Sequence, residues 1–296
     1  MNFKLRNLPK ITIVTPSFNQ GRFLEETIIS IINQGYPNLE YIVMDGGSND
    51  NSVDIIKKYA DKLTYWESKK DKGQTHAILK GFEKSSGEIL TWINSDDCLA
   101  EGALYKIAEV YTKEKADYYV GNARIIDENG IEKEHLQCNL FDNSFNNTNV
   151  FIVQPASFFT REAYTKYGPL DINLYYSMDM DFWLKIYFGG GVFKKFEFDV
   201  ALFREHGNTK TSNGYDNFLL EIIDKYKFSI QNNVPVISED IDKKILRLKT
   251  ISLLQHGSLK KRHVYSILFS SMRYLGISPI AFFVENVYQT IKRLIK

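Results

Sequence analysis

Residues 89–97 read ILTWINSDD, an apolar run that leads directly into the adjacent carboxylates Asp96 and Asp97. The apolar part is short and bounded by polar residues, which predicts a buried strand at 89–93. Two neighbouring carboxylates at a strand end repel each other unless a cation or hydrogen-bond donors neutralise them. Oxygen ligands of this kind suit Mg²⁺ or Mn²⁺, with substrate phosphates completing the shell. The alternative is a helix cap at Asp97, which precedes a short helical pattern.

The residues before this stretch alternate short apolar runs with helical patterns. Further strands are predicted at 11–15, 41–44 and 63–66, with helices at 24–32, 52–59 and 75–84. This alternation predicts an α/β fold in which parallel strands are joined by right-handed crossovers. Ligands bind such sheets outside the carboxyl ends of the strands. Polar residues at the strand ends are therefore candidates for one site.

After Asp97 the pattern predicts a mixed sheet rather than further simple repeats. Helices are predicted at 102–115, 161–167 and 178–188, strands at 118–126, 131–136, 150–160 and 193–203, and a loop at the Asn-rich stretch 141–149. We expect one catalytic domain at 1–237, with a nucleotide-binding half at 9–100 and an acceptor and catalytic half at 101–237. A basic, amphipathic helical tail follows at 238–296.

The charge of the chain is unevenly distributed. Its formal net charge is +1, but residues from Ile241 onward hold eleven Lys or Arg against two acids, which leaves the preceding part acidic. Cys98 and Cys138 lack metal-site spacing and indicate a reducing compartment. No run of 18 apolar residues and no signal-peptide pattern occurs, so we expect a cytoplasmic protein. The basic residues form no readable motif, which argues against nucleic-acid binding.

Two further strand ends carry polar clusters. Asp45 is followed by Gly46-Gly47-Ser48, where a carboxylate can accept hydrogen bonds from a ligand and glycines allow close approach to the backbone. The alternative is a strand-to-helix loop capped by Asp50 or Ser52. Residues 71–74 read DKGQ and open a helix, whose N-terminus favours phosphate. A solvated loop is the alternative there.

The second half contributes two more clusters. Asp179 and Asp181 stand two positions apart on a predicted helix and point to different sides, so that one could act as a general base and the other as a structural acceptor. The alternative is a pair of acids favoured by the helix dipole. Further on, Arg204, His206 and Lys210 could serve a metal ion or a diphosphate. A single histidine is more often structural.

Together, these segments resemble glycosyltransferase family 2, the inverting enzymes with a GT-A fold, over roughly residues 9–215. Six motifs in order carry the resemblance: TPSFN (15–19), DGGSND (45–50), DKGQ (71–74), NSDD (94–97), DMDFWL (179–184) and REH (204–206). The resemblance implies a GT-A-type α/β fold with a mixed, mostly parallel central sheet flanked by helices, plus a C-terminal helical extension. It also implies a nucleotide-sugar donor and Mn²⁺ or Mg²⁺ as cofactor.

The family's site residues transfer to positions that match its motifs. By this resemblance Asp179 is the catalytic base, and Asp97 and His206 are metal ligands. Arg204 and Lys210 are candidate diphosphate contacts. The residues implied in binding the donor nucleotide are Thr15, Pro16, Asn19, Asp45, Asp71, Gln74 and Asp96. The sequence departs from the family at Met178, where many members have Glu, which puts the acceptor-positioning role of that Glu in doubt.

The expected function is transfer of a hexose or N-acetylhexosamine from a UDP-sugar to a hydroxyl of a lipid-linked glycan. A sugar nucleotidyltransferase is an alternative, although it requires a Gly-rich basic loop after the first strand. A non-catalytic nucleotide- or carbohydrate-binding relative is another. The basic tail fits peripheral contact with the cytoplasmic face of a membrane. A helical pair that packs on the catalytic domain or forms a homodimer is the alternative for the tail.

Overall fold

The computed structural model describes residues 8–140, 152–207, 209–210 and 215–232. The chain divides into two compact units, residues 1–213 and 214–296. The sheet lies in the first unit, and the described part of the second is helix α7 (Tyr215–Gln231). The predicted loop at 141–149 and the predicted tail at 238–296 lie outside the described residues. Within the described residues no helix is long and apolar enough to cross a membrane.

Four parallel strands build the N-terminal half of the sheet, in the order β3-β2-β1-β4. They are β1 (Ile11–Ser17), β2 (Leu39–Asp45), β3 (Tyr65–Ser68) and β4 (Ile89–Trp92). Their β-branched and aromatic residues suit a pleated, buried surface. Parallel pairing places all four carboxyl ends at one edge of the sheet, with Ser17 opposite Asp45 and Asp45 opposite Ser68.

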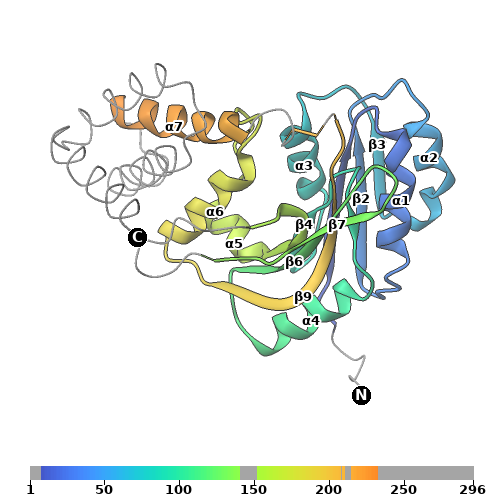
Figure 1. Cartoon of the computed structure of the whole chain (residues 1–296), viewed down its shortest axis with the longest axis horizontal. Coiled ribbons are helices and arrows are strands. Elements are labelled where there is room, and N and C mark those ends of the chain that lie inside the picture. The colour runs from blue at the N-terminus through green and yellow to red at the C-terminus, as the bar shows by residue number, and fades with distance from the viewer. Residues whose placement is uncertain (1–7, 141–151, 208, 211–214, 233–296) are drawn as a thin grey trace, which may run out of the picture. The chain divides into compact units, whose positions relative to one another are not determined.

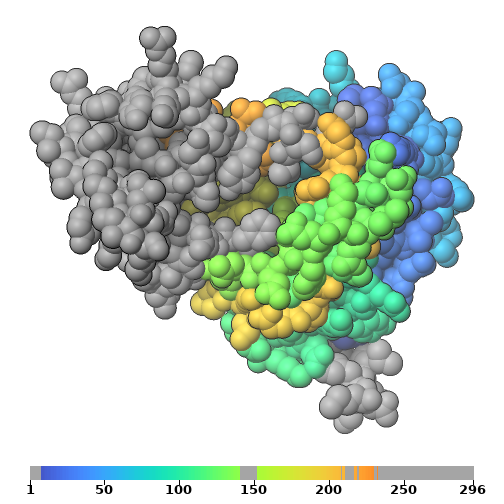
Figure 2. Space-filling view, viewed as in Figure 1, coloured from blue at the N-terminus to red at the C-terminus, as the bar shows by residue number. Residues whose placement is uncertain are grey.

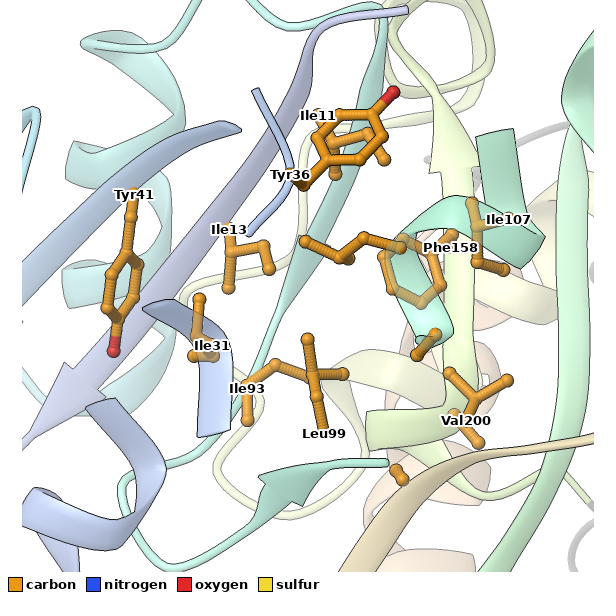
Figure 3. Packing of buried hydrophobic residues seen from close by; sticks show 14 of the residues in the cluster. Ile11, Ile13, Ile31, Tyr36, Tyr41, Ile93, Leu99, Ile107, Phe158 and Val200 are labelled. Atoms are coloured by element: carbon orange, nitrogen blue, oxygen red, sulfur yellow. The ribbon is translucent and has the colours of Figure 1, made fainter. Parts of the chain in front are cut away.

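Helices cover both faces of this half-sheet (Figure 1). On one face lie α1 (Gly21–Ile32), α2 (Ser52–Lys58) and α4 (Ala103–Lys113), and on the other lies α3 (Gln74–Glu83). Side chains of β2 alternate between the two cores: Tyr41 and Val43 pack with the first group, Ile42 and Met44 with the second. Figure 3 shows the first core, where α1 and α4 residues meet those of the strands. Burial on both faces explains why these strands read as continuous apolar runs.

The C-terminal half of the sheet is mixed. Beyond β4 the order continues β8 (Ser157–Thr160), β6 (Tyr118–Ile126), β9 (Phe193–Arg204) and β5 (Cys98–Leu99), with β7 (Glu132–Leu136) beside β6. The pairs β4–β8, β6–β8, β6–β7 and β5–β9 are antiparallel, whereas β6–β9 is parallel. Of the β6–β7 hairpin, β6 is largely buried and β7 is exposed, and Figure 2 shows the light-green β7 region on the surface of this unit. Helices α5 (Arg161–Tyr167) and α6 (Met178–Phe188) pack against the same face as α3.

The expected fold is confirmed: a mixed central sheet lies between helices, with parallel pairing concentrated in its N-terminal half. The strand predicted at 150–160 is shorter. Among its described residues, Gln154–Ala156 form a 3₁₀ turn and only Ser157–Thr160 form a strand. Pro155 accounts for the difference, because it has no N–H to donate to a ladder.

Candidate active site

The carboxylate of Asp45 organises the turn that follows β2. Its two oxygens accept hydrogen bonds from the backbone N–H groups of Gly47 and Ser48 and from the hydroxyls of Ser48 and Ser68. Asp45 is only 3% exposed. Asp45 is the acid that the family resemblance implies as the reader of the donor base. Four protein donors occupy it, so that its visible role is to shape the turn 46–48.

Asn19 joins this turn to the end of β1. Its backbone N–H donates to the Ser48 hydroxyl at 2.8 Å, and its side-chain oxygen accepts from the N–H of Asn49 at 2.9 Å. It adopts a left-handed φ of 52°, a conformation that Asn tolerates better than most residues. By contrast, Thr15 and Pro16 are buried within the strand, and the Thr15 hydroxyl lies 3.1 Å from that of Tyr41. Asn19 is thus exposed beside the turn 46–48, whereas Thr15 and Pro16 are buried at the end of β1.

The carboxylate of Asp71 lies over Gly46. A Cβ at position 46 would come within 3.1 Å of Asp71 Oδ2, so the missing side chain leaves the room that the carboxylate fills. Asp71 Oδ1 accepts from the N–H of Gly73 at 2.7 Å. No described residue donates a hydrogen bond to Oδ2. Asp71 consequently presents a carboxylate oxygen beside the turn, which Asp45 does not.

Phe18 is a candidate that the sequence reasoning missed. It follows β1 and is 61% exposed, next to Asn19 at the rim of the same turn. An aromatic face beside a nucleotide site can stack on a base. A bulky aromatic inside a polar strand-end loop was the signal available in the sequence.

Asp96 and Asp97 have different surroundings although they are neighbours. Asp97 is 1% exposed, and its oxygens accept from the Arg204 backbone N–H at 3.0 Å and from the Asn94 amide at 3.2 Å. Burial, and then the adjacent charge of Asp96, raise the pKa of the Asp97 carboxyl well above its usual value. Asp97, which we predicted to be a metal ligand, is thus turned into the protein.

Asp96 instead faces His206. Its Oδ2 lies 3.1 Å from His206 Nε2, so the two side chains are hydrogen-bonded to each other. Ligands at adjacent corners of an octahedral site around Mg²⁺ stand about 3 Å apart, since each lies about 2.1 Å from the ion. The described residues contain no group of three or more acidic, His or Cys side chains that could hold a metal. The Asp96 carboxylate together with the His206 ring nitrogen could hold a divalent cation whose other ligands are water and diphosphate oxygens.

Arg204, predicted as a diphosphate contact, is buried and bound to protein groups. Its guanidinium donates to the backbone oxygens of Asp96 (2.9 Å) and Asp127 (3.1 Å), and it forms an ion pair with Glu26. It is 1% exposed. With its donors engaged in this way, Arg204 supports the site rather than presenting its charge to a ligand.

A chain of polar side chains connects the remaining predicted residues. Lys210 Nζ donates to the Gln74 side-chain oxygen and to the Tyr175 carbonyl, both at 2.7 Å. The Gln74 amide donates to Asn94 at 2.6 Å, and the Asn94 amide donates to Asp97. The structure therefore brings Gln74 and Lys210 into contact with each other and with the strand end that carries Asp96.

Asp179 lies in the first turn of α6. The start of this helix and the residues before it contact Thr75 in the first turn of α3. The Thr75 hydroxyl donates to the Leu174 carbonyl at 3.2 Å and contacts the sulfur of Met178. Asp179 is partly exposed, whereas Asp181 is fully buried and forms an ion pair with Lys185 at 2.8 Å. Of the two acids, Asp179 is therefore the more exposed.

Met178 is buried where many family members carry Glu. Its contact with Thr75 makes it part of the junction between α3 and α6. A thioether cannot accept a strong hydrogen bond or carry a charge. This position consequently contributes packing rather than an acidic group.

The mixed sheet between helices, with polar residues gathered at the ends of its parallel strands, is a GT-A-type α/β fold. The sequence profile of "Glycosyl transferase family 2" matches residues 12–168, more than half of the chain. The chain belongs to glycosyltransferase family 2.

Relatives and solved structures agree with this assignment. The chain is 32% identical over 131 residues to the GalNAc(5)-diNAcBac-PP-undecaprenol beta-1,3-glucosyltransferase of Campylobacter jejuni, covering 43% of this chain and 42% of that protein. It spans about two fifths of the length of several curated relatives.

Two solved structures resemble the fold. Staphylococcus aureus TarS 1-349 in complex with UDP-GlcNAc has a TM-score of 0.64 at 15% identity, covering 90% of this chain and 81% of that chain. A mannosyltransferase of Pyrobaculum calidifontis, PcManGT, in complex with GDP-Man and Mn²⁺ has a TM-score of 0.55 at 16% identity, covering 94% and 84%. At such identities the likeness shows the fold alone.

Proposed function

We propose that this protein is an inverting, metal-dependent glycosyltransferase that moves a hexose or N-acetylhexosamine from a UDP-sugar to a hydroxyl of a lipid-linked glycan. The observation that carries the proposal is the Asp96–His206 pair, placed at the sheet edge that also carries Asp71. The segment that leads into Asp179 contacts Thr75, which donates to the Leu174 carbonyl. Thr75 follows Gln74, whose amide donates to Asn94 at the end of β4. Two side chains that can hold a divalent cation, an acid that can bind the base of the donor and a general base are groups that can serve such a transfer.

The donor would lie along the carboxyl ends of β1, β2 and β4. In this arrangement Asp71 Oδ2 accepts an N–H from the base, and Phe18 stacks on its ring. Asp96 and His206 would hold the divalent cation, which on binding neutralises charge on the leaving diphosphate. Lys210 donates a hydrogen bond to Gln74, which in turn donates to Asn94 after β4. Its ammonium group would add a positive charge near the diphosphate.

Asp179 would act as the general base. Removal of a proton from the acceptor hydroxyl makes the oxygen a stronger nucleophile as it attacks the anomeric carbon. Attack from the face opposite the diphosphate forms the new C–O bond as the old one breaks, so a single displacement inverts the anomeric carbon. The lipid-linked acceptor is supported by the undecaprenol-linked acceptor that names the Campylobacter jejuni relative, and UDP by the ligand of TarS.

Donor binding is the first test. We expect UDP with Mn²⁺ to raise the melting temperature of the full chain, because a ligand at about 100 times its Kd adds about 2.7 kcal/mol of stability. EDTA should remove the shift, and dTDP, GDP and CMP serve as comparisons. A chain that none of these nucleotides stabilises would contradict the proposed donor site.

The rate of sugar transfer tests the role of Asp179. Asp179→Asn should lower transfer by about 10²- to 10⁴-fold, the usual contribution of a general base, while leaving the UDP-dependent melting shift intact. Asp181→Asn is a poor control because Asp181 is buried in an ion pair, so Glu162→Gln on the neighbouring helix α5 is used instead. Unchanged turnover in Asp179→Asn would remove this residue from the role.

A further inference from the structure

The Asp96–His206 pair is supported from the protein interior by Arg204. The Arg204 side chain donates from Nε to the Asp96 carbonyl at 2.9 Å, and its backbone N–H donates to the Asp97 carboxylate at 3.0 Å. Arg204 is also the last residue of β9 and stands two positions before His206. One residue therefore fixes both the loop that carries Asp96 and the segment that carries His206.

Helix α1 provides the other half of this support. The ring of Phe23 contacts both the Arg204 guanidinium, at 5.0 Å from the ring centroid, and the His206 ring, at 4.8 Å between centroids. One helical turn later, Glu26 accepts a hydrogen bond from Arg204 Nη2. Glu26 and Phe23 are three residues apart and thus lie on the same side of the helix.

The charges in this cluster are unequally exposed. Arg204 is 1% exposed, whereas the Glu26 side chain is 60% exposed. A buried guanidinium next to a cation site repels the cation unless a carboxylate compensates it. The other side-chain acceptors of Arg204 are neutral backbone oxygens and the Cys98 sulfur, so Glu26 is the carboxylate that its guanidinium contacts.

We propose that Glu26, Arg204 and Phe23 form a positioning cluster that sets the separation of Asp96 and His206 for a divalent cation, with Glu26 balancing the Arg204 charge. This inference rests on the proposed function, because it requires that the pair binds a cation together with a nucleoside diphosphate. None of the three residues needs to touch substrate. Supporting residues of this kind commonly change metal affinity by about 10- to 100-fold when replaced.

Glu26→Gln is the informative variant. It keeps the size of the side chain and an oxygen that can accept from Arg204, but it removes the negative charge. Glu25→Gln is a matched control: Glu25 lies next to it on α1 and pairs with Lys58 at 2.6 Å, away from Arg204. Melting temperatures of the full-length variants show whether each remains folded.

The measurement is a calorimetric Mn²⁺ titration of the full-length protein in the presence of UDP. We expect Glu26→Gln to raise the Kd for Mn²⁺ about 10-fold, with transfer at saturating Mn²⁺ near that of the wild type and Glu25→Gln unchanged throughout. A Glu26→Gln protein that binds Mn²⁺ as tightly as the wild type overturns the inference, and so does an equal loss in Glu25→Gln.

The wild-type titration separates this inference from the proposed function. If the wild type with UDP fails to bind Mn²⁺, the metal-dependent function falls and the positioning role falls with it. If the wild type binds Mn²⁺ and only the effect of Glu26→Gln is missing, the function stands and the positioning role alone is lost. Arg204→Lys, which keeps the charge but not the forked donors, should also weaken Mn²⁺ binding, because its ammonium cannot reach both Asp96 and Asp127.

Discussion

At the scale of single residues, the two acids near the turn after β2 have separable roles. Asp45 accepts four hydrogen bonds while buried, so Asp45→Asn should destabilise the fold by about 1–3 kcal/mol. Asp71→Asn should leave stability nearly unchanged and weaken UDP binding about tenfold or more, because a charged acceptor for the base is lost. Urea unfolding and UDP titration measure the two effects.

A reversed result would restore Asp45 as the residue that reads the base. In that case Asp45→Asn would remain stable and lose UDP affinity, while Asp71→Asn would bind UDP normally. Ser48→Ala, which removes one donor to Asp45 without changing either acid, provides the control for the turn itself.

Glu67 gives a pH-dependent contribution to stability. Hydrogen bonds from Lys80, and then from Lys69, lower the pKa of its carboxyl to about 2. A lowered folded-state pKa stabilises the protein above the unfolded pKa of about 4.3, and the contribution disappears as pH falls from there toward 2. Glu67→Gln should thus lose about 1 kcal/mol at pH 7, and the difference from wild type should vanish near pH 2. Urea unfolding at several pH values measures it, and a difference that stays constant with pH would contradict the assignment.

The sequence predicted which residues gather at the site but not which way their side chains face. The family motifs predicted four site residues that the structure places in contact with one another: Asp96, Asp97, Arg204 and His206. Which of two adjacent acids faces outward depends on the local backbone, and a sequence pattern does not contain that. The buried Arg204 pairs with Glu26, which is 178 positions away along the chain, and a sequence pattern does not reveal a contact at that separation.

At the scale of elements, the strands and helices were predictable because their patterns are strong. The β-branched residues of β1 and the helical spacing of Leu24, Ile28 and Ile31 in α1 both lie in the buried core. Because buried positions are apolar, the spacing of apolar residues along the sequence predicts these elements. The crossing of α3 over β1 was not predictable. Gly81 lies so close to β1 that a Cβ would come within 2.5 Å of a Val14 methyl group.

Gly81→Ala tests this contact between α3 and β1. Alanine is favoured over glycine in a helix by about 1 kcal/mol, so propensity alone predicts stabilisation. We expect the opposite, a loss of about 1–3 kcal/mol, because the added methyl group overpacks the core. Val14→Ala in the same background should recover part of that loss, which a double-mutant cycle by urea unfolding would show. A stabilised Gly81→Ala protein would mean that the helix can move away from the strand.

At the scale of the whole molecule, the charge of the sequence is uneven between two parts of the chain. Residues from Ile241 onward are strongly basic, and we propose that they contact anionic lipid. Each Lys or Arg near such a surface contributes about 1 kcal/mol of attraction, which salt screens. The full chain should sediment with vesicles of phosphatidylcholine and phosphatidylglycerol, and not with phosphatidylcholine alone.

Charge reversal assigns that binding to a part of the chain. Lys292→Glu with Arg293→Glu should weaken sedimentation with the mixed vesicles, whereas Lys57→Glu with Lys62→Glu, on the exposed surface near α2, should not. Equal binding by both double variants would contradict the role of the basic region. Sedimentation that high salt leaves unchanged would contradict the electrostatic attraction itself.

The order of the strands has a consequence for behaviour at high concentration. Within the described residues the sheet ends on β3, which has four residues, and on β5, which has two, while β7 reads EKEHL. Short or charged outer strands offer few open backbone groups to a strand from another molecule. The long apolar strands β1 and β2 are enclosed between neighbours on both sides. The folded unit is thereby protected from edge-to-edge aggregation, and any condition that detaches β3 would expose β2 and remove that protection.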